Sequence, residues 1–257
     1  MNKAVVFDNT GTLLNASISI KDLATGNLTM GYSSEVAEKL KKSAIIYIQV
    51  SGDNFIKYDE NLRVFDLFNG GIDFDINISP MEISKQEVLN IVKNDSVTLK
   101  DIKDCIRHLN SYLGHIDIYS GITIILNLEN QKIEYTSVVG GPLFDGVIEC
   151  ISNLQTMGVK VFVASGDSKP ALIKLAHLIN VDEKNIFANC KDYDKANLVS
   201  NLKDLGYNVT MVGDGHNDVK AFMESDFAIL INNENNKMLV NYVDRVVSSV
   251  SEILKIV

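Results

Sequence analysis

Beyond Gly140-Gly141-Pro142 the hydrophobic pattern of the chain alternates between two periods. Fully apolar runs, which predict buried strands, alternate with stretches whose apolar residues recur every three or four positions, which predict helices. The strands are expected at residues 159–164, 185–188, 209–212, 227–231 and 243–247, and the helices at residues 144–157, 170–179, 195–205, 218–223 and 252–256. Alternation of this kind predicts a parallel sheet with helices on both faces.

The part of the chain before residue 140 begins with one more strand of this type. After that strand, the regular alternation of strands and helices is lost. Residues 4–7 form a short apolar run that ends at Asp8, as a buried parallel strand does. Further strands are expected at residues 17–20, 44–50, 72–78, 116–128 and 133–139, and helices at residues 33–43, at residues 85–92 and after Thr98. We therefore predict an α/β fold with a Rossmann-like parallel-sheet core, formed by residues 1–16 and 140–257, and an inserted α+β domain at residues 17–139.

Composition places the chain among ordinary globular proteins and narrows the choice of partners. Of its 257 residues, 46% are hydrophobic and 22% are charged, so a sizeable core is expected. The net charge is −9, from 33 acidic and 24 basic residues, which argues against non-specific binding of nucleic acid. A phosphorylated small molecule remains compatible with this charge, because a bound metal ion reverses the local field.

No targeting or membrane segment is predicted. The longest apolar runs, residues 44–48 and 122–128, are far shorter than the ~20 residues that span a bilayer. Cys105, Cys150 and Cys190 are odd in number and widely spaced, so neither a disulfide framework nor a zinc site is expected. We expect a cytoplasmic protein with reduced cysteines and no membrane partner.

The first candidate for chemistry is the stretch D-N-T-G-T-L-L, residues 8–14, at the end of the first strand. Open α/β sheets bind ligands at the carboxyl ends of their strands, where Asp8 is expected. Gly11 allows a tight turn, and Thr10 and Thr12 place hydroxyl groups nearby. An ordinary strand-to-turn junction is the alternative explanation of this stretch.

Two further strand ends carry groups that suit an anionic ligand. Ser165 and Gly166 precede a predicted helix, whose amino terminus attracts phosphate; a plain Ser cap is the alternative. Lys195 is expected to begin a helix, a position that the helix dipole disfavours and that contact with an anion would explain. A solvated surface lysine is the alternative there, and Lys191 is a rival for the same role.

The most informative strand end is M-V-G-D-G-H-N-D, residues 211–218. Asp214 and Asp218 follow a buried strand and can gather around a hard cation, whereas an Asp-Gly turn is the alternative. His216 is expected to be a bystander, because Mg²⁺ prefers oxygen ligands.

Together these four segments resemble the haloacid dehalogenase superfamily of phosphohydrolases and, more narrowly, the phosphorylation domain of P-type ATPases. The stretch D-N-T-G-T matches the D-K-T-G-T of that group with Asn9 in place of Lys, and Ser165-Gly166-Asp167 matches its T-G-D. The run at residues 211–218 matches its last motif, and the spacing selects Lys195 over Lys191. The resemblance covers about residues 1–14 and 140–230; the inserted domain lies where the superfamily carries a cap and where the pumps bind nucleotide.

The resemblance implies a mechanism and a set of site residues. Asp8 would be the nucleophile that forms an aspartyl-phosphate, on a small phosphorylated substrate and with Mg²⁺ as cofactor. The catalytic residues implied are Asp8, Thr10 and Lys195; the metal ligands are Asp8, the carbonyl of Thr10, Asp214 and Asp218; the substrate-binding residues are Thr12, Ser165, Gly166 and Asn217.

One departure shapes the expected activity. Most phosphatases of the superfamily carry a second aspartate, the general acid and base, at the position of Thr10, and a threonine cannot replace it. We therefore expect slow hydrolysis and a long-lived phosphoenzyme. A Mg-dependent phosphohydrolase is the leading hypothesis; the alternatives are an ATP-using phosphoenzyme module that works with a partner, and a non-catalytic phospho-acceptor domain. The sequence predicts neither the substrate's identity nor the oligomeric state.

Overall fold

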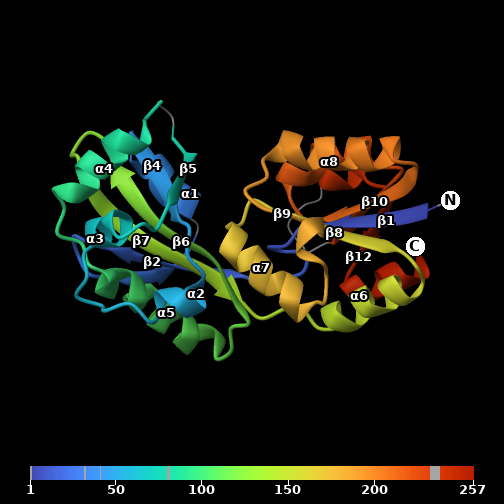
Figure 1. The fold of residues 1–257 in the computed structure, drawn as a ribbon, viewed down its shortest axis with the longest axis horizontal. Coiled ribbons are helices and arrows are strands. Elements are labelled where there is room, and N and C mark those ends of the chain that lie inside the picture. Colours follow the sequence, from blue (N-terminus) through green and yellow to red (C-terminus); the bar gives the residue numbers. More distant parts are fainter. Residues whose placement is uncertain (1, 32, 41, 80–81, 232–237) are drawn as a thin grey trace. The chain divides into compact units, whose positions relative to one another are not determined.

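The computed structural model describes residues 2–31, 33–40, 42–79, 82–231 and 238–257. The chain divides into two compact units (Figure 1): residues 1–15 together with 142–257, and residues 16–141. The first unit thus consists of two segments that are far apart in the sequence. The role of the second unit as a cap stays a prediction.

The first unit is built on a six-stranded parallel sheet with the order β12-β11-β10-β1-β8-β9. The strands are β1 (Asn2–Phe7), β8 (Lys160–Ala164), β9 (Ile186–Phe187), β10 (Tyr207–Gly213), β11 (Phe227–Ile231) and β12 (Arg245–Val247). Residues 4–7 of β1 are completely buried, which explains their uninterrupted apolar sequence. The chain passes to β8 on one side of β1 and to β10 on the other, so β1 lies at the switch point where such sheets bind ligands.

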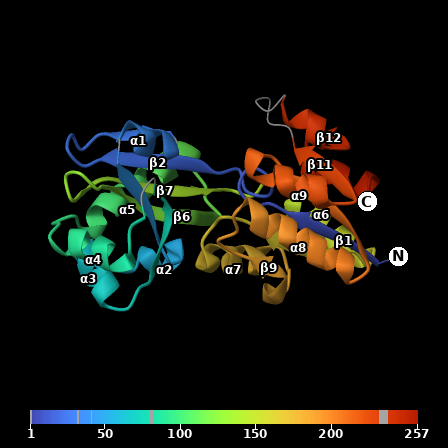
Figure 2. The same ribbon diagram turned by 90° about the horizontal axis from the view of Figure 1, so that it is seen from above.

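Helices cover both faces of this sheet, as the alternating pattern predicts (Figures 1 and 2). They are α6 (Val147–Thr156), α7 (Lys169–Leu178), α8 (Asp192–Asp204) and α9 (Val219–Glu224), with 3₁₀ turns at Glu183–Asn185, His216–Asp218, Leu239–Tyr242 and Val250–Lys255. Leu198 and Val199 of α8 and Phe222 of α9 pack on the face of the sheet that carries Val6 and Met211. Alternate strand residues therefore face different helices, and the centre of the sheet is buried, whereas the first residues of β1 and most of the short edge strand β12 are exposed.

The second unit is a six-stranded antiparallel sheet with the order β3-β2-β7-β6-β4-β5. Its strands are β2 (Ser17–Asp22), β3 (Leu28–Met30), β4 (Ser43–Ile48), β5 (Phe74–Ile78), β6 (Ile118–Asn127) and β7 (Lys132–Gly141). Its helices are α1 (Ser33–Lys39), α2 (Gly52–Phe55), α3 (Val64–Asn69), α4 (Lys85–Lys93) and α5 (Leu99–Leu113). The buried faces of α4 and α5 pack on one side of the sheet, and Ala37 of α1 packs on the other side against Ile45 and Ile125.

Several predicted elements need correction. Strand β3 lies in a segment predicted as a loop, and α2 and α3 lie in segments for which no element was predicted. The strand pairs with β2, and each of the two helices spans six residues or fewer, so none of them shows a local period. The helix expected at residues 252–256 is a 3₁₀ helix at Val250–Lys255. Capping boxes at Ser84 and Thr98 begin α4 and α5, two of the predicted helices.

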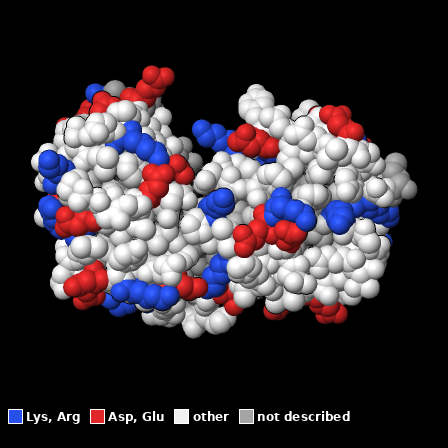
Figure 3. Space-filling model, viewed as in Figure 1, with Lys and Arg blue, Asp and Glu red and all other residues white. Residues whose placement is uncertain are grey.

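On the face of the molecule shown in Figure 3, basic and acidic side chains lie beside one another. In the second unit, Lys21 pairs with Asp101 at 2.8 Å and with Asp104 at 2.6 Å, and Arg107 pairs with Asp104 and Glu60. The pairs of Lys21 join β2 to α5, and Arg107 of α5 pairs within the helix and with the loop that carries Glu60.

Candidate active site at the carboxyl ends of the strands

Three neighbouring strands of the parallel sheet end in polar residues at the same edge. Phe7, the last residue of β1, is in register with Val212 of β10 and with Val163 of β8. Asp8 therefore follows β1 at the level where β10 leads into Asp214 and β8 leads into Ser165. The backbone N–H of Asp8 still donates to the carbonyl of Val212, at 2.9 Å, so the ladder holds Asp8 at this edge.

Lys195 reaches this edge from helix α8. The helix begins at Asp192, not at Lys195 as predicted, because acidic residues fill its first turn and Asp194 accepts a hydrogen bond from the backbone N–H of Lys191. Lys195 lies one turn further in and is completely buried, so the dipole argument from the sequence does not apply. Its Nζ lies 2.9 Å from Oδ1 of Asp8 and 2.7 Å from Oδ1 of Asp218.

The charge of Lys195 is strongly favoured at this place. Burial by itself would lower its pKa, but the charges of Asp8 and Asp218 and the hydrogen bonds to them outweigh burial, so the pKa lies above its usual range. Lys195 is therefore a permanent cation that links the nucleophile candidate to the last motif. Lys191, the rival candidate for this role, is exposed, whereas Lys195, the residue that the motif spacing selects, is buried.

Asp8, Asp214 and Asp218 form a group of carboxylates that can hold a metal ion. One oxygen from each lies within 4.8 Å of the others. Asp218 is completely buried, and its two oxygens are already bonded: Oδ1 accepts from Lys195, and Oδ2 accepts from the backbone N–H groups of Asp214 and Gly215 at 3.2 and 3.1 Å. Asp218 thus positions both Lys195 and the backbone that carries Asp214.

Glycines permit the close approach of these acids. A Cβ at Gly11 would lie 2.0 Å from Oδ2 of Asp214, and Gly11 has a φ of +86°. A Cβ at Gly213 would lie 2.3 Å from Oδ2 of Asp218. Both positions therefore exclude any other residue as long as the two carboxylates stay where they are.

The electrostatics of the site suit a hard divalent cation. Burial, followed by the charges of Asp8 and Asp218, raises the pKa of Asp214 to about 7. Burial and the charge of Asp8 also raise the pKa of Asp218, against the opposing effect of Lys195. Three carboxylates face a single ammonium group in this cluster, and the ligand atoms are all oxygen, the type that hard cations take. The residues present therefore fit such an ion.

The structure also places the remaining predicted site residues. Thr12 is completely buried, and its hydroxyl donates to Oδ1 of Asp214 at 3.3 Å, so its contact is with a candidate metal ligand. Ser165 is buried at the end of β8, whereas Gly166 and Asn217 are exposed. His216 is exposed and does not belong to the carboxylate group; that it is a bystander stays a prediction.

Two residues to which sequence reasoning gave no role complete the cluster. Asp167 accepts hydrogen bonds from the side chains of Asn9, Ser165 and Thr10, at 2.8, 2.8 and 3.2 Å. Burial raises the pKa of Asp167; the bonds from Asn9 and Ser165 oppose this shift, and the charge of Asp8 adds to it. Both residues lie in motifs that the sequence analysis identified. Asp167 is the last residue of S-G-D, and Asn9 replaces the Lys that follows the nucleophile in the related motif.

The comparison with known protein families agrees with this geometry. The model of the haloacid dehalogenase-like hydrolases matches residues 2–226 of the chain. The chain belongs to this family. The resemblance and the fold class predicted from the sequence are thereby confirmed.

Individual relatives of this hydrolase fall into two groups. It is 31% identical over 231 residues to the "soluble P-type ATPase-like phosphatase" of Methanocaldococcus jannaschii, which covers 90% of this chain and 83% of the relative. It is 27% identical over 227 residues to a "copper-transporting ATPase" of Helicobacter pylori, which covers 88% of this chain but only 29% of that pump. The catalytic domain of the CPx-ATPase CopB-B shares its fold, with a TM-score of 0.52 and 16% identity over 99% of this chain and 88% of that chain.

Within the described part of the hydrolase, every helix is too short or too polar to cross a membrane. Its predicted cytoplasmic location stays a prediction.

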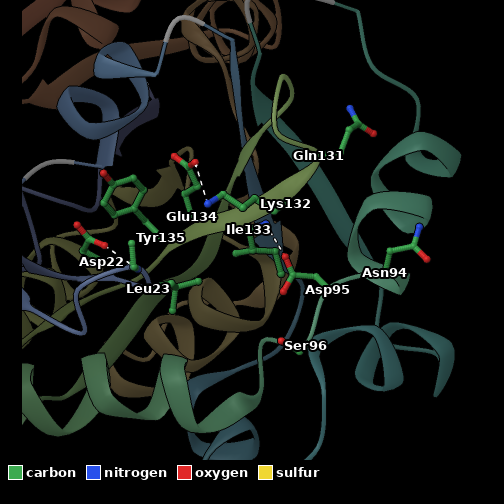
Figure 4. A pocket seen from close by; sticks show the side chains of 11 residues that line it. Asp22, Leu23, Asn94, Asp95, Ser96, Gln131, Lys132, Ile133, Glu134 and Tyr135 are labelled. Carbon is green, nitrogen blue, oxygen red and sulfur yellow. Dashed lines mark hydrogen bonds and ion pairs between the residues drawn. The ribbon is translucent and has the colours of Figure 1, made fainter.

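A separate cavity of about 450 Å³ lies in the second unit, between the start of β7, the end of β2 and the loop after α4 (Figure 4). Its acidic side chains serve the surrounding loops. Asp95 accepts from the backbone N–H groups of Ile133 and Val97, at 2.7 and 3.0 Å, and Asp22 accepts from that of Ala24 at 2.8 Å. Two of the acidic side chains that line this cavity are thus bonded within the surrounding loops.

Proposed function

We propose that this hydrolase cleaves small phosphate esters through a phosphorylated Asp8, with Mg²⁺ as its cofactor. The observation that carries the proposal is the carboxylate of Asp8, buried at the switch point of the sheet and paired with Lys195 at 2.9 Å. A buried carboxylate fixed by a cation at a strand end is suited to attack an electrophile. The relationship to the phosphatase of Methanocaldococcus jannaschii supports phosphorus as that electrophile.

The proposed reaction has two steps. An oxygen of Asp8 bonds to phosphorus while the bond from phosphorus to the ester oxygen breaks, and the leaving oxygen departs with the electron pair and takes a proton from water. A water molecule then attacks the phosphorus of the aspartyl-phosphate, which releases inorganic phosphate and restores the carboxylate. Lys195 neutralises Asp8 during the approach of the negatively charged substrate and can donate to a phosphoryl oxygen.

The chain's own residues define where the cofactor and the phosphoryl group would bind. Asp8, Asp214 and the backbone carbonyl of Thr10 would hold Mg²⁺, with Asp218 beside them and bonded to Lys195. When bound, the ion offsets negative charge and polarises a phosphoryl oxygen. The Ser165 hydroxyl and the N–H of Gly166 would bind further phosphoryl oxygens, and the exposed Asn217 would contact the substrate near the entrance.

Thr10 sets the expected substrate preference. Its hydroxyl donates to Asp167 and cannot protonate a leaving oxygen at neutral pH. Substrates with good leaving groups, such as p-nitrophenyl phosphate, should therefore react much faster than alkyl phosphates, and phosphorylated Asp8 should accumulate.

A direct experiment tests the proposal. The full chain is assayed with p-nitrophenyl phosphate and a panel of phosphorylated metabolites, with Mg²⁺ and with excess chelator, alongside the variant Asp8→Asn. We expect Mg-dependent release of phosphate that the substitution abolishes. Full turnover by Asp8→Asn would exclude Asp8 as the nucleophile and with it the whole mechanism.

A second function is favoured by the match to the copper-transporting ATPase of Helicobacter pylori, which covers 88% of this chain. In this alternative the chain takes the γ-phosphoryl group of ATP onto Asp8 and works with a partner protein. Stable transfer of label from γ-labelled ATP to Asp8, with poor hydrolysis of p-nitrophenyl phosphate, would select it. A chain that is phosphorylated but never turns over would instead be a phospho-acceptor domain.

A further inference from the structure

The buried side chain of Asn9 is held in a costly arrangement. Asn9 is completely buried, its Nδ2 donates to Oδ2 of Asp167 at 2.8 Å, and nothing within the described residues donates to its Oδ1. Turning the amide over would place its oxygen against the carboxylate, so the observed orientation is the favourable one. An apolar side chain would avoid the unpaired acceptor. The amide at this position is therefore explained by the hydrogen bond that it gives to Asp167.

Asp167 collects donors from two loops. Asn9 and Thr10 come from the loop after β1, and Ser165 comes from the loop after β8. The main chain anchors Asp167 in turn, because its carbonyl accepts from the N–H of Asn189 at 3.0 Å and its own N–H donates to the Ser165 hydroxyl at 3.3 Å. One carboxylate thus ties together the loops that carry the nucleophile and the phosphoryl-binding hydroxyl.

The hydrogen bonds to Asp167 lie just beyond the paired ends of β1 and β8. The register between β1 and β8 ends with Phe7 opposite Val163, so Asp8 and Ser165 lie beyond the last paired residues of these strands. Beyond that point, hydrogen bonds from side chains to Asp167 connect the loop after β1 to the loop after β8. The spacing of these loops matters for catalysis, because a displacement of ~1 Å at a reacting centre can cost about 10²-fold in rate.

We propose that Asp167, held through Asn9, is a positioning residue that orients the hydroxyls of Thr10 and Ser165 beside Asp8 for phosphoryl transfer. The inference rests on the proposed function, since it assigns a role within that reaction. The side-chain hydrogen bonds described for Asp167 are to Asn9, Thr10 and Ser165 and not to Asp8, so its effect is expected on the turnover step.

The test uses the full chain with p-nitrophenyl phosphate and Mg²⁺, and three variants: Asp167→Asn, Asn9→Asp, and the two substitutions combined. The first replaces the charged acceptor of the three donors by a neutral amide, and the second sets two carboxylates against each other. The combined variant reverses the pair. All three partners of Asp167 meet its Oδ2, so an amide group at that place can give one hydrogen to a carboxylate at position 9 and the other to a hydroxyl that rotates to accept it. Asp244→Asn, which alters an acceptor for the backbone N–H of Ala228 in the same unit, is the control.

We expect kcat to fall by about 10²-fold in Asp167→Asn, with KM changed less than about threefold, and to fall at least as far in Asn9→Asp. The combined variant should recover at least about tenfold over either single one, and Asp244→Asn should match the unchanged chain. Inhibition by inorganic phosphate and the melting temperature are measured for every variant. A purely structural role would lower the melting temperature in step with kcat in the single variants and restore both together in the combined one. The positioning role predicts losses of kcat that exceed the change in melting temperature.

Two results separate the possible failures. An active wild-type chain whose kcat is unaffected by Asp167→Asn, or a combined variant that is no better than the single ones, overturns the positioning role and leaves the proposed function standing. A wild-type chain that hydrolyses no phosphate ester overturns the proposed function, and the positioning role falls with it.

Discussion

Replacing Lys195 by Met would remove the cation that contacts Asp8 and Asp218 and keep a side chain of similar length. Lys195 is completely buried, with its Nζ 2.9 Å from Asp8 and 2.7 Å from Asp218. In Lys195→Met these two carboxylates would remain buried next to each other without a counter-charge. Breaking a buried ion pair in this way is strongly destabilising, by ~3–5 kcal/mol, because the partner charge is left unpaired.

The loss of unfolding free energy in Lys195→Met has an upper limit, because a buried acid can take up a proton, and this limit depends on pH. One of the two acids can escape the penalty by taking a proton, which costs 1.36 kcal/mol for each unit by which the pH exceeds its ordinary pKa of about 3.9. The upper limit is therefore about 5 kcal/mol at pH 7.5 and about 2 kcal/mol at pH 5.5. In this range the folded variant binds more protons than the folded unchanged chain, because it takes one up in place of the lost ammonium charge, so its deficit shrinks as the pH falls.

The assay is thermal unfolding of the metal-free chain at both pH values. A loss of 3–5 kcal/mol corresponds to a melting temperature lower by about 6–20 °C at pH 7.5, and roughly half of this deficit should vanish at pH 5.5. Lys203→Met is a matched control in the same helix, because Lys203 is one-third exposed and lies 3.6 Å from Asp226. This exposed pair should contribute less than about 1 kcal/mol.

The reasoning would be refuted by a deficit in Lys195→Met that stays constant between the two pH values, or by one no larger than that of Lys203→Met. In either case the charge of Lys195 would not be what stabilises the two acids. Activity gives a second reading: loss of a preorganised donor to the phosphoryl group should lower kcat by about 10²–10³-fold.

Other predictions follow from the same cluster. Because burial raises the pKa of Asp214 to about 7, Mg²⁺ must displace a proton, so its affinity measured by calorimetry should rise between about pH 6 and 8; an affinity independent of pH would contradict this. Gly11→Ala should abolish Mg²⁺ binding and destabilise the fold, since its Cβ would lie 2.0 Å from Asp214, whereas Gly206→Ala, with a φ of +84° and nothing within 4 Å, should cost only about 1–2 kcal/mol in chemical unfolding. Equal losses in the two alanine variants would show that the contact with Asp214 is unimportant. Thr12→Val should weaken Mg²⁺ binding by about fivefold through loss of its hydrogen bond to Asp214, and Thr12→Ser should restore it; failure of Ser to restore it would assign the effect to packing.

The parallel sheet and the strand ends could be predicted because their signals are local. The run at residues 4–7 is apolar throughout because β1 is buried on both faces, and Asp8 directly after it is where the strand leaves the core. The last motif shows a local signal in the same way, since the position of the Asp218 carboxylate requires a glycine at position 213, within the same motif.

Other features depend on contacts between distant residues and leave no local trace. The position of Lys195 one turn inside α8 follows from the acidic first turn and from its ion pair with Asp8, 187 positions away in the sequence. The hydrogen bond from Asn9 to Asp167 spans 158 positions, so only the unusual Asn hinted at it. Strand β3 is likewise defined by its pairing with β2, because three residues show no period of their own.

The place of β1 within its sheet has a consequence for biosynthesis. Its two hydrogen-bonded neighbours, β8 and β10, are translated more than 150 residues later, whereas the second unit is one uninterrupted segment. The apolar residues of β1 therefore leave the ribosome before their partner strands have been synthesised and stay exposed to solvent. The second unit, which lies between them in the sequence, can fold during this time. Nascent chains arrested ahead of β10 should accordingly be held by chaperones through residues 4–7.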